Sequence, residues 1–299
     1  MRVLVTGGSG FIGRPVTERL RAAGAEVHLW RRAEGPAMAG CRLHAGDLLD
    51  AAARRRVLSE ARPTHLVHLA WTTAHGRYWD DPANLHWADA SLDLLEAFAR
   101  QGGRHALVAG SCAEYDWSAL GPDGRPTADT PLQGATLYGR SKAALGQQAR
   151  ALAERLAITL TWGRVFFPFG PGEHPARLVP SIARALLAGQ PALTGPPEVA
   201  RDLLAVDDLA AMIVLLTTRG HDGALDLCSG QATPIGWVAS RLAELLGQPG
   251  LLRLGALPAR AGDPARLAGS PELLATLGWQ PEVGIEQGLR RSLEWWRRQ

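Results

Sequence analysis

Short runs of apolar residues alternate with longer amphipathic segments over about the first 165 residues of the chain. The apolar runs predict buried strands at 2–6, 26–30, 42–45, 65–70, 104–109 and 158–162. Apolar positions at helical spacing predict helices between them, at 11–23, 50–60, 82–100 and from about 134 to 156. Because a crossover between parallel strands needs a helix that covers the sheet, this alternation predicts an α/β fold with a Rossmann-like, doubly wound parallel sheet.

The pattern changes after about residue 165, where prolines interrupt the chain at Pro168, Pro171, Pro175 and Pro180. Helices then alternate with short strands to the end. We therefore expect a dinucleotide-binding domain at 1–165 and a smaller mixed α/β substrate lobe at 166–299. The boundary is soft, because segments of the second lobe are expected to return to the main sheet, and the two lobes are expected to close one cleft.

Composition excludes several classes of protein. With 46% hydrophobic and 20% charged residues, the 299-residue chain has an ordinary globular composition. A net charge of +3 is too small to indicate a nucleic-acid-binding face, and no apolar run is long enough to span a membrane. The cysteines Cys41, Cys112 and Cys228 form no CxxC pair, so neither a metal site nor a disulfide framework is expected. A cytoplasmic protein fits these features best.

The first predicted strand leads into a glycine-rich segment, Thr6-Gly-Gly-Ser-Gly-Phe-Ile-Gly13. Gly7 permits a tight turn, Gly10 lets the backbone approach a pyrophosphate, and Gly13 allows close packing of helix on strand. The start of the following helix offers free N–H groups to phosphates. We predict a dinucleotide-binding loop that includes Phe11 and Ile12; the alternative is a glycine-rich turn that binds nothing.

The GxxGxxG spacing and the segment TGGSGFIG resemble the extended branch of the short-chain dehydrogenase/reductase superfamily, which contains sugar-nucleotide epimerases, dehydratases and reductases. The resemblance covers nearly the whole chain. It implies that Asp47, followed by Leu48, lies at the position that binds the adenine of the cofactor. It also implies that Ala70, after the fourth strand, lines the cofactor cleft.

The second predicted strand ends at Arg31 and Arg32, where proteins that prefer NAD usually place an acidic residue for the adenosine ribose. Guanidinium groups suit a 2′-phosphate instead, because they form charge-assisted, bidentate hydrogen bonds. NADP(H) is therefore favoured and NAD(H) is the alternative, in which both arginines are solvated loop residues.

Tyr138 and Lys142 are four residues apart, so they lie on one face of the predicted helix that follows the fifth strand. A neighbouring ammonium favours the phenolate, so we expect a lowered pKa for Tyr138. Both residues match the YxxxK motif of the family, whose lysine also binds the nicotinamide ribose. Ser111, at the end of the fifth strand, matches the family's catalytic Ser or Thr. It is expected to bind the substrate oxygen while Tyr138 transfers the proton.

Candidate substrate residues follow from the same resemblance. Arg201, in a segment similar to RDFxxVxD, is expected to bind the diphosphate of a sugar nucleotide. His174 and Arg177 follow a segment similar to RxxNxYGP, in which Phe167 replaces the usual Asn, and are expected to line the pocket. Trp71 suits stacking on a sugar or a base; a place in the core or a lid is the alternative.

Together these motifs predict an NADP(H)-dependent reductase of a nucleotide-activated 4-keto-6-deoxy sugar. Dehydratases of the family carry Asp and Glu directly after the catalytic Thr, and this chain has Cys112 and Ala113 there, which disfavours dehydration. A C4 epimerase that retains NAD is the alternative, and a catalytically silent dinucleotide sensor is a third hypothesis. The resemblance also implies a homodimer formed by the helices on either side of the fifth strand.

Overall fold

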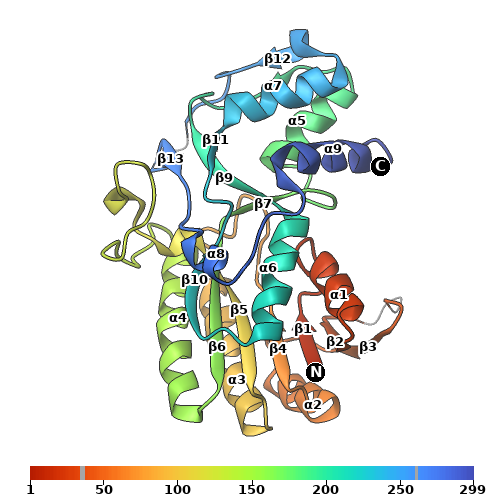
Figure 1. Ribbon diagram of the computed structural model, residues 1–299, viewed down its shortest axis with the longest axis vertical. Coiled ribbons are helices and arrows are strands. Elements are labelled where there is room, and N and C mark those ends of the chain that lie inside the picture. Colours follow the sequence, from red (N-terminus) through yellow and green to blue (C-terminus); the bar gives the residue numbers. More distant parts are fainter. Residues whose placement is uncertain (34–37, 260–261) are drawn as a thin grey trace. The chain divides into compact units, whose positions relative to one another are not determined.

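A computed structural model describes residues 1–33, 38–259 and 262–299 of the chain (Figure 1). Its main sheet has seven strands in the order β10-β6-β5-β4-β1-β2-β3. The pairings from β3 to β6 are all parallel, which confirms the predicted doubly wound α/β fold. The strands are β1 (Arg2–Thr6), β2 (Glu26–Arg31), β3 (Cys41–Ala45), β4 (His65–His68), β5 (His105–Ser111), β6 (Thr159–Val165) and β10 (Gly223–Leu227).

In the described chain, four helices lie between β1 and β6, namely α1 (Gly13–Ala22), α2 (Ala51–Ala61), α3 (Ala83–Arg100) and α4 (Leu137–Leu156). Two of them begin where a polar side chain caps free backbone N–H groups. The Asp50 carboxylate accepts a hydrogen bond from the Ala52 N–H at 2.9 Å, and the Thr136 hydroxyl accepts one from the Gly139 N–H at 3.2 Å. The predicted helices are thus present, with ends displaced by a few residues.

The strand order reverses beside β1, since β2 and β3 lie on one side of it and β4, β5 and β6 on the other. Ligands of such sheets bind beyond the carboxyl ends of the strands at this reversal. β4 stops at His68, two residues short of the prediction, because the Ala70 N–H turns to the hydroxyl of Thr6 at 3.3 Å. The reversal therefore places the glycine-rich segment after β1 next to the end of β4.

The core of this part of the molecule lies between the sheet and helices α2, α3 and α4. It is built from aliphatic and aromatic side chains that the strands and helices share, among them Leu4, Val57, Leu66, Leu94, Phe98, Val108, Leu145 and Trp162. Since crossovers between parallel strands are right-handed, the reversal at β1 places α1 on the opposite face. The site at the carboxyl edge thus rests on a sheet that is packed on both faces.

Most of the remaining elements form a smaller mixed sheet with helices. β9 (Ala200–Ala205) pairs antiparallel with β11 (Ala232–Pro234) and parallel with β7 (Phe167–Phe169) and β13 (Arg266–Leu267). A separate parallel pair joins β8 (Ala192–Leu193) to β12 (Leu252–Arg253). The helices beside these strands are α5 (Leu178–Leu187), α7 (Ile235–Leu246), α8 (Glu272–Thr276) and α9 (Gly284–Trp296), with 3-10 turns η2 (Trp117–Ala119) and η3 (Pro249–Leu251). The 3-10 turn η1 (Cys112–Glu114) and most of α6 (Val206–Arg219) belong to the unit that holds the main sheet.

The chain passes more than once between two compact units. The first unit contains residues 1–115, 132–165 and 210–225, and the second contains 116–131, 166–209 and 226–299. The second unit has its own core, in which Val179, Ile182, Leu186, Leu242 and Leu289 are buried. None of the helices in the described part of the chain is both long and apolar enough to cross a membrane.

Candidate active site

The glycine-rich segment after β1 forms a turn that other residue types would disrupt. Gly7 has a φ of +70°, and a Cβ on it would lie 2.8 Å from the backbone nitrogen of Ala70. A Cβ on Gly13 would lie 2.1 Å from the carbonyl oxygen of Gly7. The turn is thus a backbone cradle at the start of α1, and it fits the pyrophosphate of a dinucleotide. Phe11 and Ile12 complete it and are partly exposed.

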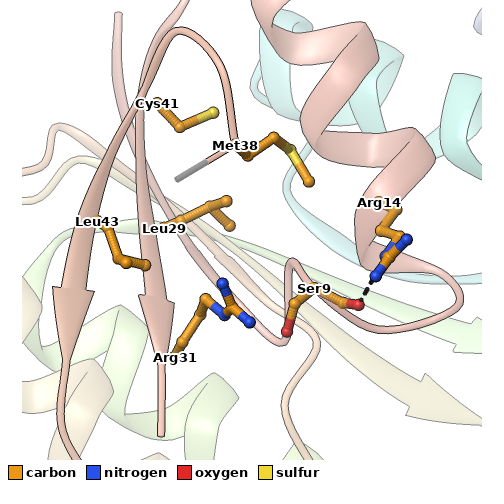
Figure 2. A pocket seen from close by; sticks show the side chains of 7 residues that line it. All are labelled: Ser9, Arg14, Leu29, Arg31, Met38, Cys41 and Leu43. Carbon is orange, nitrogen blue, oxygen red and sulfur yellow. Dashed lines mark hydrogen bonds between the residues drawn. The ribbon is translucent and has the colours of Figure 1, made fainter. Parts of the chain in front are cut away.

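A cavity of about 210 Å³ lies at the carboxyl end of β2 (Figure 2). Its described lining consists of Ser9, Arg14, Leu29, Arg31, Met38, Cys41 and Leu43. Of the two predicted arginines, Arg31 lines this cavity, whereas Arg32 is exposed and is not part of the lining. Arg14 was not predicted; its Nε donates to the carbonyl oxygen of Ser9 at 3.1 Å. Two guanidinium groups therefore border a cavity without an acidic side chain in its described lining.

The other residues predicted to hold the cofactor lie at the same edge of the sheet. Asp47 follows β3, is exposed, and accepts a hydrogen bond from the Leu49 N–H at 3.0 Å. Leu48 is 5% exposed and packs in the core. Ala70 lies against Gly7, as described above.

Ser111 and Tyr138 meet at the end of β5. Their side chains are hydrogen bonded to each other. The ring of Tyr138 is partly exposed, but its hydroxyl lies among protein atoms, and this burial raises the pKa of Tyr138 above its usual value. The expected lowering of that pKa is therefore not found, because loss of hydration outweighs the hydrogen bond from Ser111.

Two glycines allow the turn after Ser111 to approach the start of α4. A Cβ on Gly134 or on Gly139 would lie 2.2 Å or 2.1 Å, respectively, from the carbonyl oxygen of Ala113. Gly139 directly follows Tyr138, so the close approach that it permits brings the phenol to Ser111. The glycine in the segment Tyr-Gly-Arg-Ser-Lys is therefore a packing requirement of the site.

Lys142 lies one turn further along α4 and is 4% exposed. Its Nζ donates a hydrogen bond of 2.8 Å to the carbonyl oxygen of Ala109 on β5. Burial lowers the pKa of Lys142 to about 7, and the carboxylate of Glu114 opposes this effect. The lysine is thus held at the same strand end as Ser111 and Tyr138.

The buried side chain of Glu114 stabilises the turn at Ser111. Its carboxylate accepts hydrogen bonds from the Ser111 N–H at 2.7 Å and from Arg164 Nε at 2.9 Å. Glu114 is 1% exposed, and its burial raises the pKa of the carboxyl although the guanidinium opposes this. This ion pair was not predicted. The Ser-x-x-Glu spacing of a capping box is the sequence signal that could have indicated it.

An aromatic cluster surrounds Tyr138. The rings of Trp71, Tyr78 and Trp79 lie 6.4 Å, 5.1 Å and 5.9 Å from the Tyr138 ring, each in an edge-on arrangement. The Tyr138 N–H also donates to the carbonyl oxygen of Trp79 at 2.8 Å. The loop after β4 therefore surrounds the candidate catalytic tyrosine with aromatic rings, and Trp71, predicted as a substrate residue, is one of these rings.

The remaining predicted substrate residues lie in the second unit. Arg201 on β9 is 7% exposed, and its guanidinium donates to the carboxylate of Asp263 at 3.1 Å and to the carbonyl oxygen of Pro264 at 2.8 Å. In this structure a carboxylate thus occupies part of the anion-binding capacity predicted for Arg201.

His174 and Arg177 lie on the turn that precedes α5. His174 is exposed and its Nδ1 accepts from the Ala176 N–H at 3.2 Å, while Arg177 occupies the N-cap position of α5 without a side-chain capping hydrogen bond and is partly buried. Their neighbour Glu173 is 7% exposed, and its Oε2 has no hydrogen-bond partner among the described residues. Burial raises the pKa of Glu173 to about 8, so the carboxyl is largely protonated at neutral pH. Glu173 was not among the residues predicted from the sequence.

No group of three or more His, Cys, Asp or Glu side chains in the described ranges is arranged to hold a metal ion. The three cysteines are free thiols, and Cys112 and Cys228 are buried.

Residues 3–226 match the NAD dependent epimerase/dehydratase family. The chain belongs to this family. The predicted resemblance is thus confirmed, and the protein is an enzyme of the extended short-chain dehydrogenase/reductase type, whose members are NAD(P)-dependent oxidoreductases, epimerases and dehydratases.

Relatives of this family enzyme include both epimerases and a reductase. It is 30% identical to the UDP-glucose 4-epimerase of Corynebacterium glutamicum, over 94% of this chain and 91% of the relative. It is 29% identical to the GDP-6-deoxy-D-mannose reductase of Pseudomonas aeruginosa, over 99% and 97%. The crystal structure of the Thermus thermophilus UDP-glucose 4-epimerase, a complex with NAD, is similar with a TM-score of 0.88 and 28% identity, over 99% of both chains.

Proposed function

We propose that this enzyme is an NADP(H)-dependent reductase of a nucleotide-activated 4-keto-6-deoxy sugar. The observation that carries the proposal is the hydrogen bond between Ser111 and Tyr138, with Lys142 on the same helical face. Among its relatives, the GDP-6-deoxy-D-mannose reductase has the reaction type proposed here.

The protonation state of Tyr138 supports reduction. A ketoreductase needs a phenol that donates its proton to the new alkoxide, and the raised pKa of Tyr138 keeps the phenol protonated at neutral pH. Ser111 orients the carbonyl oxygen by donating a hydrogen bond to it. Lys142 then stabilises the phenolate that remains. When bound, a nicotinamide would supply the hydride that the carbonyl carbon needs, and the proton from Tyr138 would complete the alcohol.

The cavity at the end of β2 supports NADP(H). Arg14 and Arg31 bring two positive charges to its lining, which suits a 2′-phosphate better than a ribose diol. The cradle formed by Gly7, Gly10 and Gly13 would hold the pyrophosphate. For the substrate, Arg201 is the candidate diphosphate ligand, and Trp71, His174 and Arg177 are each candidate substrate contacts.

A C4 epimerase is the second candidate, because the chain is similar to a UDP-glucose 4-epimerase in complex with NAD. An epimerase begins by removing a proton from a hydroxyl, which requires Tyr138 as a phenolate. The burial of the Tyr138 hydroxyl opposes that form.

The stoichiometry of the cofactor separates the two candidates. Purified enzyme is incubated with dTDP-, UDP- and GDP-linked 4-keto-6-deoxy sugars and with NADPH or NADH, and the reactions are stopped at intervals. Reduction consumes one NADPH for each product molecule and leaves NADH largely unused. Turnover without net consumption of either cofactor would favour epimerisation and reject the proposal.

A cytoplasmic homodimer is part of the same proposal. α3 and α4 pack against each other, and Leu85 on α3 is an apolar side chain with 52% of its surface exposed. Sedimentation of the wild type and of Leu85→Asp tests the dimer: we expect the variant to shift toward the monomer, and a monomeric wild type would contradict it.

A further inference from the structure

Lys142 is the only lysine in the sequence. An ammonium with 4% exposure has lost almost all of its hydration, so the protein must supply its stabilisation. The carbonyl oxygen of Ala109 accepts one hydrogen bond from it, at 2.8 Å. The second contact is aromatic: Nζ lies 3.6 Å from the centroid of the Trp71 ring. At that distance the ammonium meets the negative face of the indole.

The indole is held in place by a buried amide. Trp71 Nε1 donates to Asn84 Oδ1 at 2.8 Å. Asn84 is fully buried, and its Nδ2 donates to the carbonyl oxygens of Tyr78 and Asp81 at 2.7 Å and 2.8 Å. Because both amide hydrogens point at carbonyls, the Oδ1 atom must face the indole N–H. The orientation of the ring over Lys142 is therefore specified by a complete set of hydrogen bonds.

Two further titratable groups face the lysine from the neighbouring elements. Glu114 in η1 carries a carboxyl whose charge favours the ammonium. His68 on β4 is buried, and burial together with Lys142 lowers the pKa of His68 to about 3, so it is neutral and adds no charge. Trp71 is thus the direct stabilising contact on the side of the ammonium that faces the loop after β4.

We propose that Trp71 is a positioning residue of the catalytic group, whose indole face holds the Lys142 ammonium beside the carbonyl oxygen of Ala109. Asn84 acts through Trp71 by fixing the plane of the ring. The inference depends on the proposed function only for its catalytic consequence, because the contact between Trp71 and Lys142 exists without substrate.

Burial lowers the pKa of Lys142, so the replacement for Trp71 must remove the aromatic face and still keep an apolar side chain over the ammonium. A desolvated cation–π contact stabilises the charged form, so removing the ring makes the ammonium easier to deprotonate. We expect Trp71→Leu to lower the pKa of Lys142 by about one unit or more from its value near 7. At neutral pH the lysine then becomes mostly uncharged. In turnover, the alkaline limb of the kcat profile moves to lower pH, whereas KM changes less.

The single lysine makes a direct measurement possible. Incorporation of ¹³C-lysine yields one Cε resonance, and its pH titration reports the pKa of Lys142 in the intact enzyme without any substrate. Trp71→Phe keeps an aromatic face, so its Lys142 pKa is expected to lie between the values of Trp71→Leu and the wild type. Trp79→Leu is the matched control, because Trp79 contacts the Tyr138 ring rather than the ammonium, and it is expected to titrate like the wild type.

A Lys142 pKa in Trp71→Leu equal to that of the wild type would overturn the inference. If that variant does not fold, Trp71→Met removes the aromatic face while filling the space with a flexible side chain. An unchanged Lys142 pKa in Trp71→Met would overturn the inference in the same way. If Trp71→Leu lowers the pKa of Lys142 but the wild-type enzyme reduces no 4-keto sugar, the positioning role of Trp71 is supported and only the proposed substrate is rejected. If the wild-type enzyme reduces a 4-keto sugar but Trp71→Leu leaves the pKa of Lys142 unchanged, only the role of Trp71 is rejected.

Discussion

The carboxylate of Glu114 lies beneath Ser111 and accepts a hydrogen bond of 2.7 Å from the backbone N–H of that residue. It also accepts hydrogen bonds from Trp162 Nε1, at 3.0 Å, and from Arg164 Nε, at 2.9 Å. The turn that presents the serine hydroxyl to Tyr138 is therefore supported by a buried ion pair. Such pairs contribute little relative to an apolar replacement, but losing one partner leaves a buried charge without compensation.

Glu114→Gln should destabilise the protein, because the substitution leaves the Arg164 guanidinium, which is 13% exposed, without its carboxylate. We expect a loss of about 3 kcal/mol in the free energy of unfolding, measured by urea denaturation. Glu96→Gln is the control, since its ion pairs with Arg100 and Arg155 lie at the surface and the variant should change stability by less than about 1 kcal/mol. Equal effects of the two variants would contradict this account.

Tyr138→Phe should abolish most turnover while leaving cofactor affinity nearly unchanged. The substitution removes the proton donor but keeps the ring that packs against Trp71, Tyr78 and Trp79. A decrease in kcat of about 10²-fold or more is expected, with NADPH affinity followed by fluorescence titration. Full activity in this variant would refute the proton role.

Arg31→Ala should weaken NADPH more than NADH. A lost charge-assisted contact to a 2′-phosphate predicts a decrease of about tenfold or more in NADPH affinity, measured by calorimetry. Arg14→Ala should act in the same direction, because Arg14 lines the same cavity. Arg32→Ala is the internal control and should have a smaller effect. Equal weakening of both cofactors by Arg31→Ala would show that this cavity does not recognise the phosphate.

A buried hydrogen-bond chain makes His68 sensitive to acid. The Ser91 hydroxyl donates to the carbonyl oxygen of Trp87 at 2.6 Å, so its oxygen must accept from His68 Nε2, at 2.8 Å. His68 Nδ1 then accepts from the hydroxyl of Thr6 at 2.6 Å. This arrangement uses the neutral imidazole, and a second proton on Nδ1 would break the bond to Thr6.

Stability should therefore decrease as the pH falls. The pKa of His68 is lowered from 6.5 to about 3, so the unfolded chain binds a proton in this window while the folded chain does not. Between about pH 6.5 and 3, this one site should reduce the free energy of unfolding by up to about 1.4 kcal/mol per pH unit. Urea denaturation at several pH values should show a shallower slope for His68→Leu than for the exposed control His86→Leu. Identical slopes would exclude His68 as the source.

Asp263 and a phosphate should compete for Arg201. The Asp263 carboxylate lies 3.1 Å from the guanidinium, at a group expected to bind the diphosphate. Asp263→Asn removes the competing charge, so the affinity for UDP, dTDP or GDP should rise several-fold in calorimetry, whereas Arg201→Ala should lower it. If neither variant changes nucleotide affinity, Arg201 is a structural residue of β9.

Features that depend on neighbouring residues or on chain order could be predicted from the sequence. The glycine-rich segment after β1 determines its tight turn locally, and Gly13 has no room for a Cβ. Tyr138 and Lys142 share a helical face because four residues make about one turn. The alternation of strands and helices specifies a parallel sheet, and Ser111 and the glycine-rich segment lie at its carboxyl edge.

Features that depend on long-range packing were decided by the tertiary structure. Trp71 meets Lys142, and Glu114 meets Arg164, only after the sheet brings distant segments together. The sequence predicts a lowered pKa for Tyr138 from a nearby charge, but the folded chain raises it, because burial of the hydroxyl is a property of the packed loop after β4. Local spacing thus indicated the candidate catalytic groups, and tertiary packing decided their solvation, which determines whether each group is protonated.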